Sequence, residues 1–364
     1  MTDPSQNVRV ELGDRSYDIE IGRGNLARTG EFIAARTKIT HGIIITDARV
    51  EQLHAETVRA SLLRGGARVD LIAVPEGERS KSMERATTLW NQLLDLGADR
   101  RSVVVAVGGG VVGDLAGFIA ATFTRGIPFF QIPTTLLAQV DSSVGGKVGV
   151  NLPRAKNMVG AFWQPLGVLI DTEVLKSMTE RDYRAGLAEV VKYGVILDAE
   201  FFAFLEANVA GLLGRRHDVL RRVIARSCEL KAQVVAGDER DESGLRAVLN
   251  YGHTFAHAIE SESRYDTHLH GEAVSIGMMC AAHLAERLGR VSPLFTQRQQ
   301  RLLEALGLPI VPLDVKADAL LAAMLHDKKV EHGQLRFVLP TRLGHVELVG
   351  NIDPGDVKAA LSAQ

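Results

Sequence analysis

The sequence predicts two domains, an N-terminal α/β domain with a doubly wound parallel sheet and a mostly α-helical C-terminal domain. Its 364 residues are more than twice the roughly 150 residues of an average domain. In the first half, short apolar runs alternate with helical stretches, which is typical of right-handed βαβ units. Beyond residue 178, long helical patterns follow one another with few strand-like runs between them. We therefore expect domains at 1–178 and 179–364.

The first predicted elements are strands. Residues 8–12 and 17–21 alternate apolar and polar side chains around the turn GDRS, which indicates a β-hairpin. The runs that follow are short, β-branched and apolar throughout, as strands buried on both faces of a parallel sheet are. These runs are 43–46, 69–74, 103–107 and 168–171.

Helices are predicted between and after these strands. Apolar side chains recur at helical spacing over 82–96, and Gly97 follows as a C-cap. A strand-like pair is also expected at 335–339 and 345–350. The helical patterns of the second half cover 182–197, 200–213, 217–236, 247–262, 272–288, 297–306 and 316–326.

Composition excludes several classes of function. With 42 Lys+Arg against 44 Asp+Glu, the net charge is −2, so no overall positive field indicates a nucleic-acid or membrane-surface partner. The 2 cysteines are too few for a disulfide framework or a thiolate metal site. The N-terminal residues lack a signal-peptide pattern, and no uncharged apolar run reaches about 18 residues. We expect a cytoplasmic protein without a membrane partner.

A glycine-rich turn, Gly108 to Gly110, joins the run 103–107 to a helix that is expected to begin near Val112. Free backbone N–H groups and a positive helix end meet at such a turn, which suits a pyrophosphate. The pattern is not GxGxxG, and a tight connection without a ligand is an equal alternative. Three charged residues, Asp47, Glu78 and Lys81, follow other predicted strands. Ligands of α/β sheets bind at these strand ends. Asp47 could equally be a helix N-cap.

Four histidines cluster at 253–270, namely His253, His257, His268 and His270. His253 and His257 are four residues apart, so both imidazoles could reach one metal ion from one helix face. A third ligand could come from His270 or from Glu189. The alternative is a set of partly buried imidazoles without a metal. Ligands of nitrogen and oxygen, with no thiolate, favour a catalytic Zn²⁺ or a similar ion.

Basic residues are scattered through otherwise apolar, glycine-rich segments. A lysine in apolar surroundings is costly to desolvate unless an anion meets it. Each one taken alone could be a surface cation, but together they indicate an anionic small-molecule substrate. They are Arg125, Lys147, Lys156, Lys192, Lys231 and Arg246.

Nine motifs, in order along most of the chain, resemble the 3-dehydroquinate synthase family of the shikimate pathway. They are PEGERSKS, GGGVVGDLAGF, IPTTLLAQVDSSVGGKVGVN, AKNMVGAF, GLAEVVKYG, DERDESGLR, NYGHTFAHAIE, HGEAVSIGM and DKKV. The resemblance implies a Rossmann-like N-terminal domain, a helical metal-binding domain and usually a homodimer. It also implies a lyase that uses NAD and Zn²⁺, with Co²⁺ as another possible metal. The reaction implied is the conversion of 3-deoxy-D-arabino-heptulosonate 7-phosphate to 3-dehydroquinate and phosphate.

The resemblance also implies roles for individual residues. The metal ligands are Glu189, His253 and His270, which makes His257 a proton-transfer residue and not a ligand. The catalytic residues are His257, Glu242, Lys147 and Lys192. NAD is bound by Asp47, Glu78, Lys81, Gly109, Gly110, Val111, Asp114, Thr134, Thr135, Lys147, Lys156 and Leu175. The substrate is bound by Arg125, Asp141, Lys147, Asn157, Lys192, Lys231, Arg246, Asn250, His257 and one lysine of the pair Lys328 and Lys329.

Two alternative functions share this architecture. A metal-dependent polyol dehydrogenase has an uncharged substrate, which would not need Lys147, Lys192 and Arg246. Another sugar phosphate cyclase would keep the lysines on the phosphate side. A guanidinium binds a carboxylate through two parallel hydrogen bonds, so Arg246 and Asn250 favour a carboxylated substrate.

Overall fold

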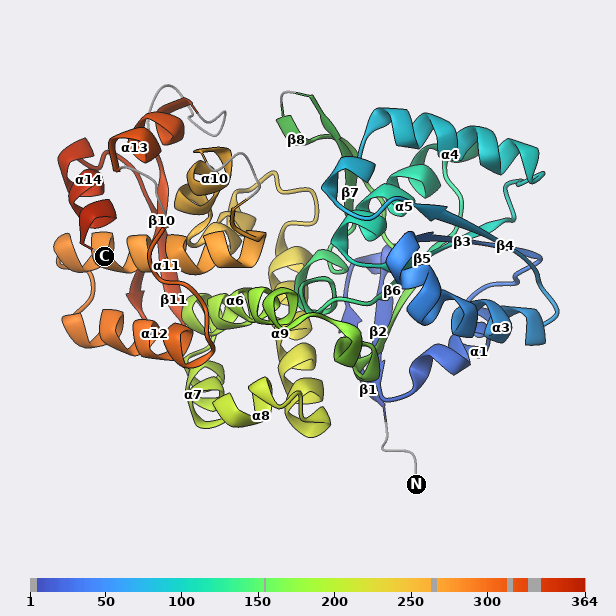
Figure 1. Cartoon of the computed structure of the whole chain (residues 1–364), viewed down its shortest axis with the longest axis horizontal. Coiled ribbons are helices and arrows are strands. Elements are labelled where there is room, and N and C mark those ends of the chain that lie inside the picture. The colour runs from blue at the N-terminus through green and yellow to red at the C-terminus, as the bar shows by residue number, and fades with distance from the viewer. Residues whose placement is uncertain (1–4, 154, 263–266, 313–316, 327–334, 364) are drawn as a thin grey trace. The chain divides into compact units, whose positions relative to one another are not determined.

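The computed structural model describes residues 5–153, 155–262, 267–312, 317–326 and 335–363. It divides into two compact units, coloured along the chain in Figure 1. The first unit comprises Met1–Met178 with Leu220–Arg240, and the second comprises Thr179–Val219 with Asp241–Gln364. The break at residue 178 coincides with the expected boundary. The segment 220–240, however, packs with the first unit, whereas the sequence pattern groups it with the helical second half.

A seven-stranded sheet forms the centre of the first unit, in the order β1-β2-β9-β6-β5-β3-β4. The hairpin β1–β2 is antiparallel, as expected, and every other neighbouring pair in this sheet is parallel. The strands are β1 (Gln6–Val10), β2 (Tyr17–Gly22), β3 (His41–Asp47), β4 (Arg68–Val74), β5 (Val103–Gly108), β6 (Phe129–Pro133) and β9 (Gly167–Asp171).

Helices cover both faces of this sheet. Neighbouring residues of a strand point to opposite faces. Phe129 of β6 belongs to the apolar cluster that includes α4 and α5, whereas Phe130 meets Phe32 of α1 edge-to-face at 6.1 Å. The helices of this unit are α1 (Thr29–Ala34), α2 (Ala48–Val50), α3 (Glu56–Arg64), α4 (Met83–Asp95), α5 (Gly110–Thr122) and most of α9 (His217–Gly237).

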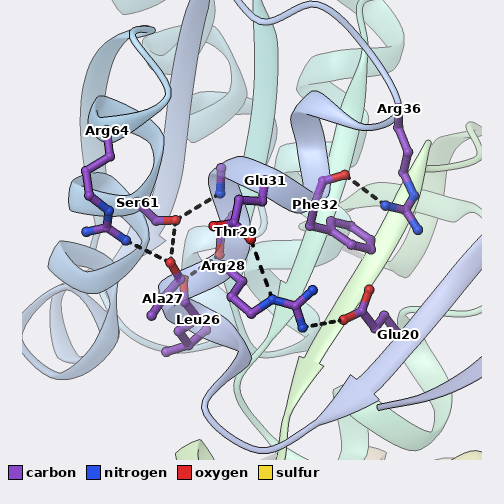
Figure 2. A network of polar contacts seen from close by, with 11 residues as sticks. Glu20, Leu26, Ala27, Arg28, Thr29, Glu31, Phe32, Arg36, Ser61 and Arg64 are labelled. Atoms are coloured by element: carbon purple, nitrogen blue, oxygen red, sulfur yellow. Dashed lines mark hydrogen bonds and ion pairs between the residues drawn. The ribbon is translucent and has the colours of Figure 1, made fainter. Parts of the chain in front are cut away.

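A polar network fixes α1 against α3 (Figure 2). The Ser61 hydroxyl accepts a hydrogen bond from the Gly30 amide at 3.0 Å and donates one to the Ala27 carbonyl at 2.8 Å. Arg64 donates to the same carbonyl at 2.8 Å. A Cβ on Gly30 would lie 2.4 Å from the Ser61 carbonyl oxygen. The two helices therefore approach closely enough for one serine of α3 to satisfy backbone groups of α1 and of the turn before it.

The second unit is mostly helical. Its central helix α11 contacts α6, α10, α12, α14 and strand β10. A hairpin of β10 (Phe337–Arg342) and β11 (His345–Val349) confirms the expected strand pair. The helices are α6 (Glu180–Leu197), α7 (Ala199–Ala207), α8 (Val209–Leu213), α10 (His253–Glu262), α11 (His270–Arg287), α12 (Pro293–Ala305), α13 (Ala317–His326) and α14 (Pro354–Ser362).

These observations confirm the predicted fold class, an α/β unit combined with a mostly helical one. Some elements differ from the prediction. The expected helix 247–262 is a 3₁₀ turn followed by α10, because Gly252 between them has φ +79. The hairpin of β7 (Lys147–Leu152) and β8 (Ala155–Phe162) was not predicted. Within the described ranges, no helix is both long and apolar enough to cross a membrane.

Candidate active site

The carboxyl edge of the parallel strands gathers the residues expected to bind NAD. Because neighbouring strands run in the same direction, the segments that follow β3, β4, β5, β6 and β9 all lie along one edge of the sheet. Those segments contain Asp47, Glu78 with Lys81, Gly109 to Val111, Thr134 with Thr135, and Leu175. Ligands of open α/β sheets bind at this edge, so these residues share the place where a ligand is expected.

The turn between β5 and α5 requires its glycines. A Cβ on Gly108 would lie 2.6 Å from the Cβ of Val112, and one on Gly109 would lie 3.1 Å from Thr135 Cγ2. The helix begins at Gly110 without a side-chain cap, so its first N–H groups remain available to a ligand. Nearby, the buried Thr134 hydroxyl has no hydrogen-bond partner within the part of the chain that is described. Backbone donors and an unsatisfied hydroxyl fit a phosphate-bearing ligand.

Asp47 caps the short helix α2, which was the alternative interpretation of this residue. Its Oδ1 accepts hydrogen bonds from the amides of Arg49 at 3.0 Å and Val50 at 2.9 Å. Both bonds use the same oxygen, and Asp47 is the last residue of β3, at the carboxyl edge of the sheet. Capping and ligand binding are therefore compatible at this position.

Lys81 links residues from several elements. Its ammonium donates to Asp114 Oδ2 on α5 and to Asn157 Oδ1 on β8. The backbone N–H of Asn157, a residue with φ +57, donates a hydrogen bond to Asn151 Oδ1 at 2.9 Å. Asn151 in turn donates to Glu78 Oε1 at 2.7 Å. Three expected NAD residues and one expected substrate residue thus form one network.

One residue of this network, Asn151, was not predicted, although it lies in the motif VGGKVGVN and connects the network. Burial raises the pKa of the Asp114 carboxyl above its ordinary value, and the Lys81 ammonium opposes this shift. Lys81 and Asp114 thus place an ammonium and a carboxylate close to the glycine turn before α5. A polar ligand at this turn could form hydrogen bonds with both groups.

The structure also brings Asp141 and Lys231 together within the first unit. The Lys231 ammonium lies 2.9 Å from Asp141 Oδ1 and 2.8 Å from its carbonyl oxygen. Lys147 begins β7 and is exposed, with its Nζ 5.9 Å from the Phe162 ring centroid. Lys156 lies on β8, and Arg125 has φ +71 in the turn before β6.

In the second unit, Glu189, His253 and His270 form a cluster with metal-ligand character. Their candidate ligand atoms all lie within 4.8 Å of one another. Glu189 Oε1 is 3.4 Å from His253 Nε2 and 3.6 Å from His270 Nε2. His257 is not part of this cluster, so the pairing of His253 with His257 suggested by their spacing is not the grouping found here. Its ring centroid lies 5.7 Å from that of His253.

The surroundings of this cluster set the protonation of its three side chains. Burial alone would raise the pKa of Glu189, but Lys192 and the two imidazoles outweigh it and hold the pKa well below its ordinary value. Burial and the Lys192 ammonium lower the pKa of His253 to about 3, so that imidazole is neutral and its Nε2 can be a ligand. For His270, burial is outweighed by hydrogen bonds to Glu189 and Glu260, which raise the pKa to about 10. Glu189 is therefore a carboxylate and His253 a neutral imidazole, the forms in which both can bind a metal.

Each histidine of the cluster is oriented through its other ring nitrogen. His253 Nδ1 lies 3.1 Å from the Tyr251 carbonyl oxygen. His270 Nδ1 lies 3.2 Å from Glu260 Oε1. Metal-binding histidines commonly have such partners, which fix the ring orientation and the tautomer. Glu260 is buried and was not assigned a role from the sequence.

Other expected substrate residues lie in the same unit. Lys192 is one turn after Glu189 on α6, is almost fully buried and pairs with Glu189 Oε2. Arg246 is buried and Asn250 ends the same 3₁₀ segment, whereas Glu242 is exposed. The expected residue Lys328 and its neighbour Lys329 lie outside the described residues.

Comparison with known proteins agrees with this arrangement. Family models described as the N-terminal and C-terminal parts of 3-dehydroquinate synthase match residues 71–185 and 186–330. The chain is 53% identical over 370 residues to the 3-dehydroquinate synthase of Rhodopirellula baltica, covering 100% of this chain and 98% of that protein.

Two solved structures of sugar phosphate cyclases are also similar. One is 2-deoxy-scyllo-inosose synthase complexed with carbaglucose-6-phosphate, NAD⁺ and Co²⁺, with a TM-score of 0.88, 28% identity and coverage of 98% of this chain and 99% of that chain. The other is 2-epi-5-epi-valiolone synthase from Streptomyces hygroscopicus with NAD⁺ and Zn²⁺, with a TM-score of 0.87, 29% identity and 97% coverage of both chains. The family models together with the full-length relative show that the chain belongs to the 3-dehydroquinate synthase family.

Proposed function

We propose that this chain catalyses the 3-dehydroquinate synthase reaction, converting 3-deoxy-D-arabino-heptulosonate 7-phosphate to 3-dehydroquinate and inorganic phosphate. The observation that carries the proposal is the 53% identity to a 3-dehydroquinate synthase along the whole chain. Identity to the two cyclases of known structure is 28% and 29%. The chain is therefore an enzyme of the carbon–oxygen lyase type.

NAD and a divalent metal, Zn²⁺ or Co²⁺, are the proposed cofactors. Glu189, His253 and His270 would hold the metal, because two imidazoles and one carboxylate without a thiolate suit a catalytic zinc site with a position open to substrate. The glycine turn and the Thr134 hydroxyl would receive the nucleotide. When bound, NAD accepts and returns a hydride, and the metal lowers the pKa of the substrate hydroxyl that is oxidised.

The basic residues position and neutralise the phosphate of the substrate. We assign Lys147, Asn157 and Lys192 to the phosphate side, where cations stabilise the charge that develops on the leaving oxygens. Lys192 is almost fully buried beside Glu189, and a buried ammonium is most stable where anions surround it. His257 and Glu242 are the proposed proton-transfer residues. The imidazole of His257 and the carboxylate of Glu242 would carry the proton.

The remaining residues bind the carboxylate and hydroxyl groups. We assign Arg246 to the carboxylate, because a buried guanidinium can form two charged hydrogen bonds with it. Asn250, Asp141, Lys231 and Lys328 are the proposed hydroxyl and carboxylate contacts. The NAD contacts at Asp47, Glu78 and Lys81 belong to the first unit.

The assembly and location are also proposals. We propose that the protein acts in the cytoplasm as a homodimer, with Arg125 reaching a neighbouring subunit's site. The family resemblance supports this setting. The molecule that binds in the active site is a small sugar phosphate.

One experiment tests the proposed reaction. Purified protein is incubated with NAD⁺, Zn²⁺ and the heptulosonate phosphate, and inorganic phosphate, NADH absorbance and the carboxylated product are followed together. We expect one phosphate per product and no net NADH. Phosphate release from glucose 6-phosphate in place of the heptulosonate would indicate another cyclase. Accumulation of NADH with glycerol, without phosphate release, would overturn the proposal in favour of a polyol dehydrogenase.

A further inference from the structure

Three successive turns of α6 meet the start of α11. Arg181, Ala185 and Glu189 are spaced four residues apart, so they lie along one face of α6. Each faces one residue at the beginning of α11. Arg181 pairs with Glu272, Ala185 meets Gly271, and Glu189 meets His270.

The middle contact brings the two backbones together directly. A Cβ on Gly271 would lie 1.8 Å from the Ala185 carbonyl oxygen, which no side chain could tolerate. The start of α11 therefore rests on the backbone of α6 between the other two contacts. Any sliding of α11 along α6 would change the separation between Glu189 and His270.

The outer contact is a network centred on Arg181. Its Nε donates to Glu272 Oε1 and its Nη2 to Glu272 Oε2, both at 2.7 Å. Nη2 also donates to the Thr267 carbonyl at 2.7 Å. Glu272 Oε2 accepts a further hydrogen bond from the Leu269 amide at 2.8 Å. Backbone or side-chain groups on both sides of His270 are thus connected to one guanidinium on α6.

We propose that Arg181 is a positioning residue of the metal site, which fixes the start of α11 on α6 and thereby holds His270 opposite Glu189. This inference rests on the proposed function, because it takes the cluster to be the metal site. Arg181 itself touches none of the three ligand side chains. A guanidinium is required because its planar fork binds both carboxylate oxygens and leaves an N–H for the Thr267 carbonyl, whereas an ammonium is a point charge without this geometry.

Metal affinity tests the proposal without depending on activity. The apoprotein is titrated with Zn²⁺ against a chelating dye, and the visible spectrum of the Co²⁺ form is recorded. Loss of a residue that is hydrogen-bonded directly to a ligand typically weakens metal binding by about 10- to 100-fold. Because Arg181 acts one contact further out, we expect Arg181→Ala to weaken Zn²⁺ binding by up to about 10-fold and to change the Co²⁺ bands. Arg181→Lys keeps the charge but not the fork, so its affinity should be intermediate.

Arg287→Ala is the matched control. Arg287 is the last residue of α11, the helix that Arg181 contacts at its other end. Its Nε lies 2.6 Å from Asp356 Oδ1, and its side chain is 53% exposed compared with 57% for Arg181. This control should bind Zn²⁺ as the wild type does. Melting temperatures of the apoproteins verify that each variant is folded. If Arg181→Ala does not fold, the Zn²⁺ affinities of Glu272→Gln and Arg181→Lys test the positioning role in its place.

The outcomes separate this inference from the proposed function. Wild-type affinity in Arg181→Ala and Arg181→Lys, or an equal loss in Arg287→Ala, would overturn the positioning role while the proposed function stood. Failure of the wild type to bind Zn²⁺ or Co²⁺ would instead refute the metal site itself, and both proposals with it.

Discussion

Glu260 connects the side chain of His270 to helix α10. The carboxylate is buried and its Oε1 lies 3.2 Å from His270 Nδ1. A carboxylate in this position fixes the imidazole and raises its basicity as a ligand. We therefore predict that Glu260→Gln weakens Zn²⁺ binding by about 10- to 100-fold, measured by dye competition. Glu262→Gln, at an exposed position on the same helix, is the control and should leave the affinity unchanged.

Arg246 provides a second test at the residue scale. Its guanidinium is buried, and a hydrogen bond to a charged group contributes about 1.5–3 kcal/mol, or roughly 10- to 150-fold. We expect Arg246→Ala to reduce kcat/KM for the heptulosonate phosphate by at least that factor and to leave NAD binding nearly unchanged. Kinetics and NAD titration of the same preparation measure both effects. Equal losses in the two measurements would contradict the carboxylate role.

Cys228 gives a prediction that depends on pH. Burial raises the pKa of this thiol to about 12 from an ordinary 9.0. Because the folded-state pKa is raised, the neutral thiol stabilises the protein fully below about pH 9, and this contribution is lost as the pH rises toward 12. The difference in unfolding free energy between wild type and Cys228→Ala should therefore be constant below pH 9 and shrink above it. Urea unfolding at several pH values measures it.

The same burial predicts the chemical behaviour of both cysteines. Cys228 and Cys280 are fully buried, and the thiolate is the form that reacts with alkylating reagents. At pH 8 the native protein should react with neither iodoacetamide nor a disulfide reagent, and both thiols should react in urea. Rapid alkylation of native Cys228 would show that its surroundings are more open than the structure indicates.

At this scale, sequence reasoning identifies residue types more readily than their partners. The motifs supply Glu189, His253 and His270, but spacing alone favours His257 as a ligand, because two residues four apart on a helix face together. The separation of Glu189 from His270 in the sequence hides their contact, since it depends on how α6 packs against α11. Arg181 was missed for the same reason, and Glu260, although near the histidines in the sequence, was given no role.

At the scale of elements, Gly271 determines how closely α11 packs on α6. An added methyl group would lie 1.8 Å from the Ala185 carbonyl oxygen, so the helices would have to separate. Overpacking of this kind costs about 1–3 kcal/mol, and we expect Gly271→Ala to lower the unfolding free energy by that amount and to weaken Zn²⁺ binding. Gly350→Ala, where the nearest neighbouring atom would be 3.8 Å away, should change neither quantity.

The sequence predicts elements best where the apolar pattern is uninterrupted or clearly periodic. The strands β3, β4, β5 and β9 and the helix α4 follow from continuous or periodic apolar residues. Strand β6 was missed because FFQIP contains a glutamine and ends in proline, which obscures its pattern. The expected helix 200–213 is divided into α7 and α8 at Asn208, whose φ of −122 interrupts helical geometry. Such breaks depend on local backbone geometry and not on hydrophobic periodicity.

At the scale of the whole molecule, most of helix α9 belongs to the first unit, because residues 220–240 pack with Met1–Met178. Cys228 Sγ donates to the Gln139 carbonyl at 3.2 Å, and Lys231 pairs with Asp141. Near its end, Glu239 accepts two hydrogen bonds from Arg15 at 3.0 and 2.6 Å. Helical periodicity indicates that α9 is a helix but not which unit its apolar face is buried in. The boundary at residue 178 therefore describes the order of the chain better than its packing.

This arrangement predicts how fragments of the chain behave. A fragment of residues 1–178 lacks the buried side chains Ile224 and Val235 of α9. They share a helix face with Cys228 and Lys231, which contact Gln139 and Asp141 of the first unit. Each buried aliphatic side chain contributes about 1.5–3 kcal/mol, which is a large part of the 5–15 kcal/mol that stabilises a typical domain. We expect this fragment to bind a hydrophobic dye and to be cleaved rapidly by protease. Fusing 220–240 to it through a long Gly/Ser linker should restore a cooperative thermal transition, whereas a fused 220–240 segment with Ile224 and Val235 changed to serine should not. A cooperative transition in 1–178 alone, at the same temperature as in the fusion, would show that α9 is dispensable to the first unit.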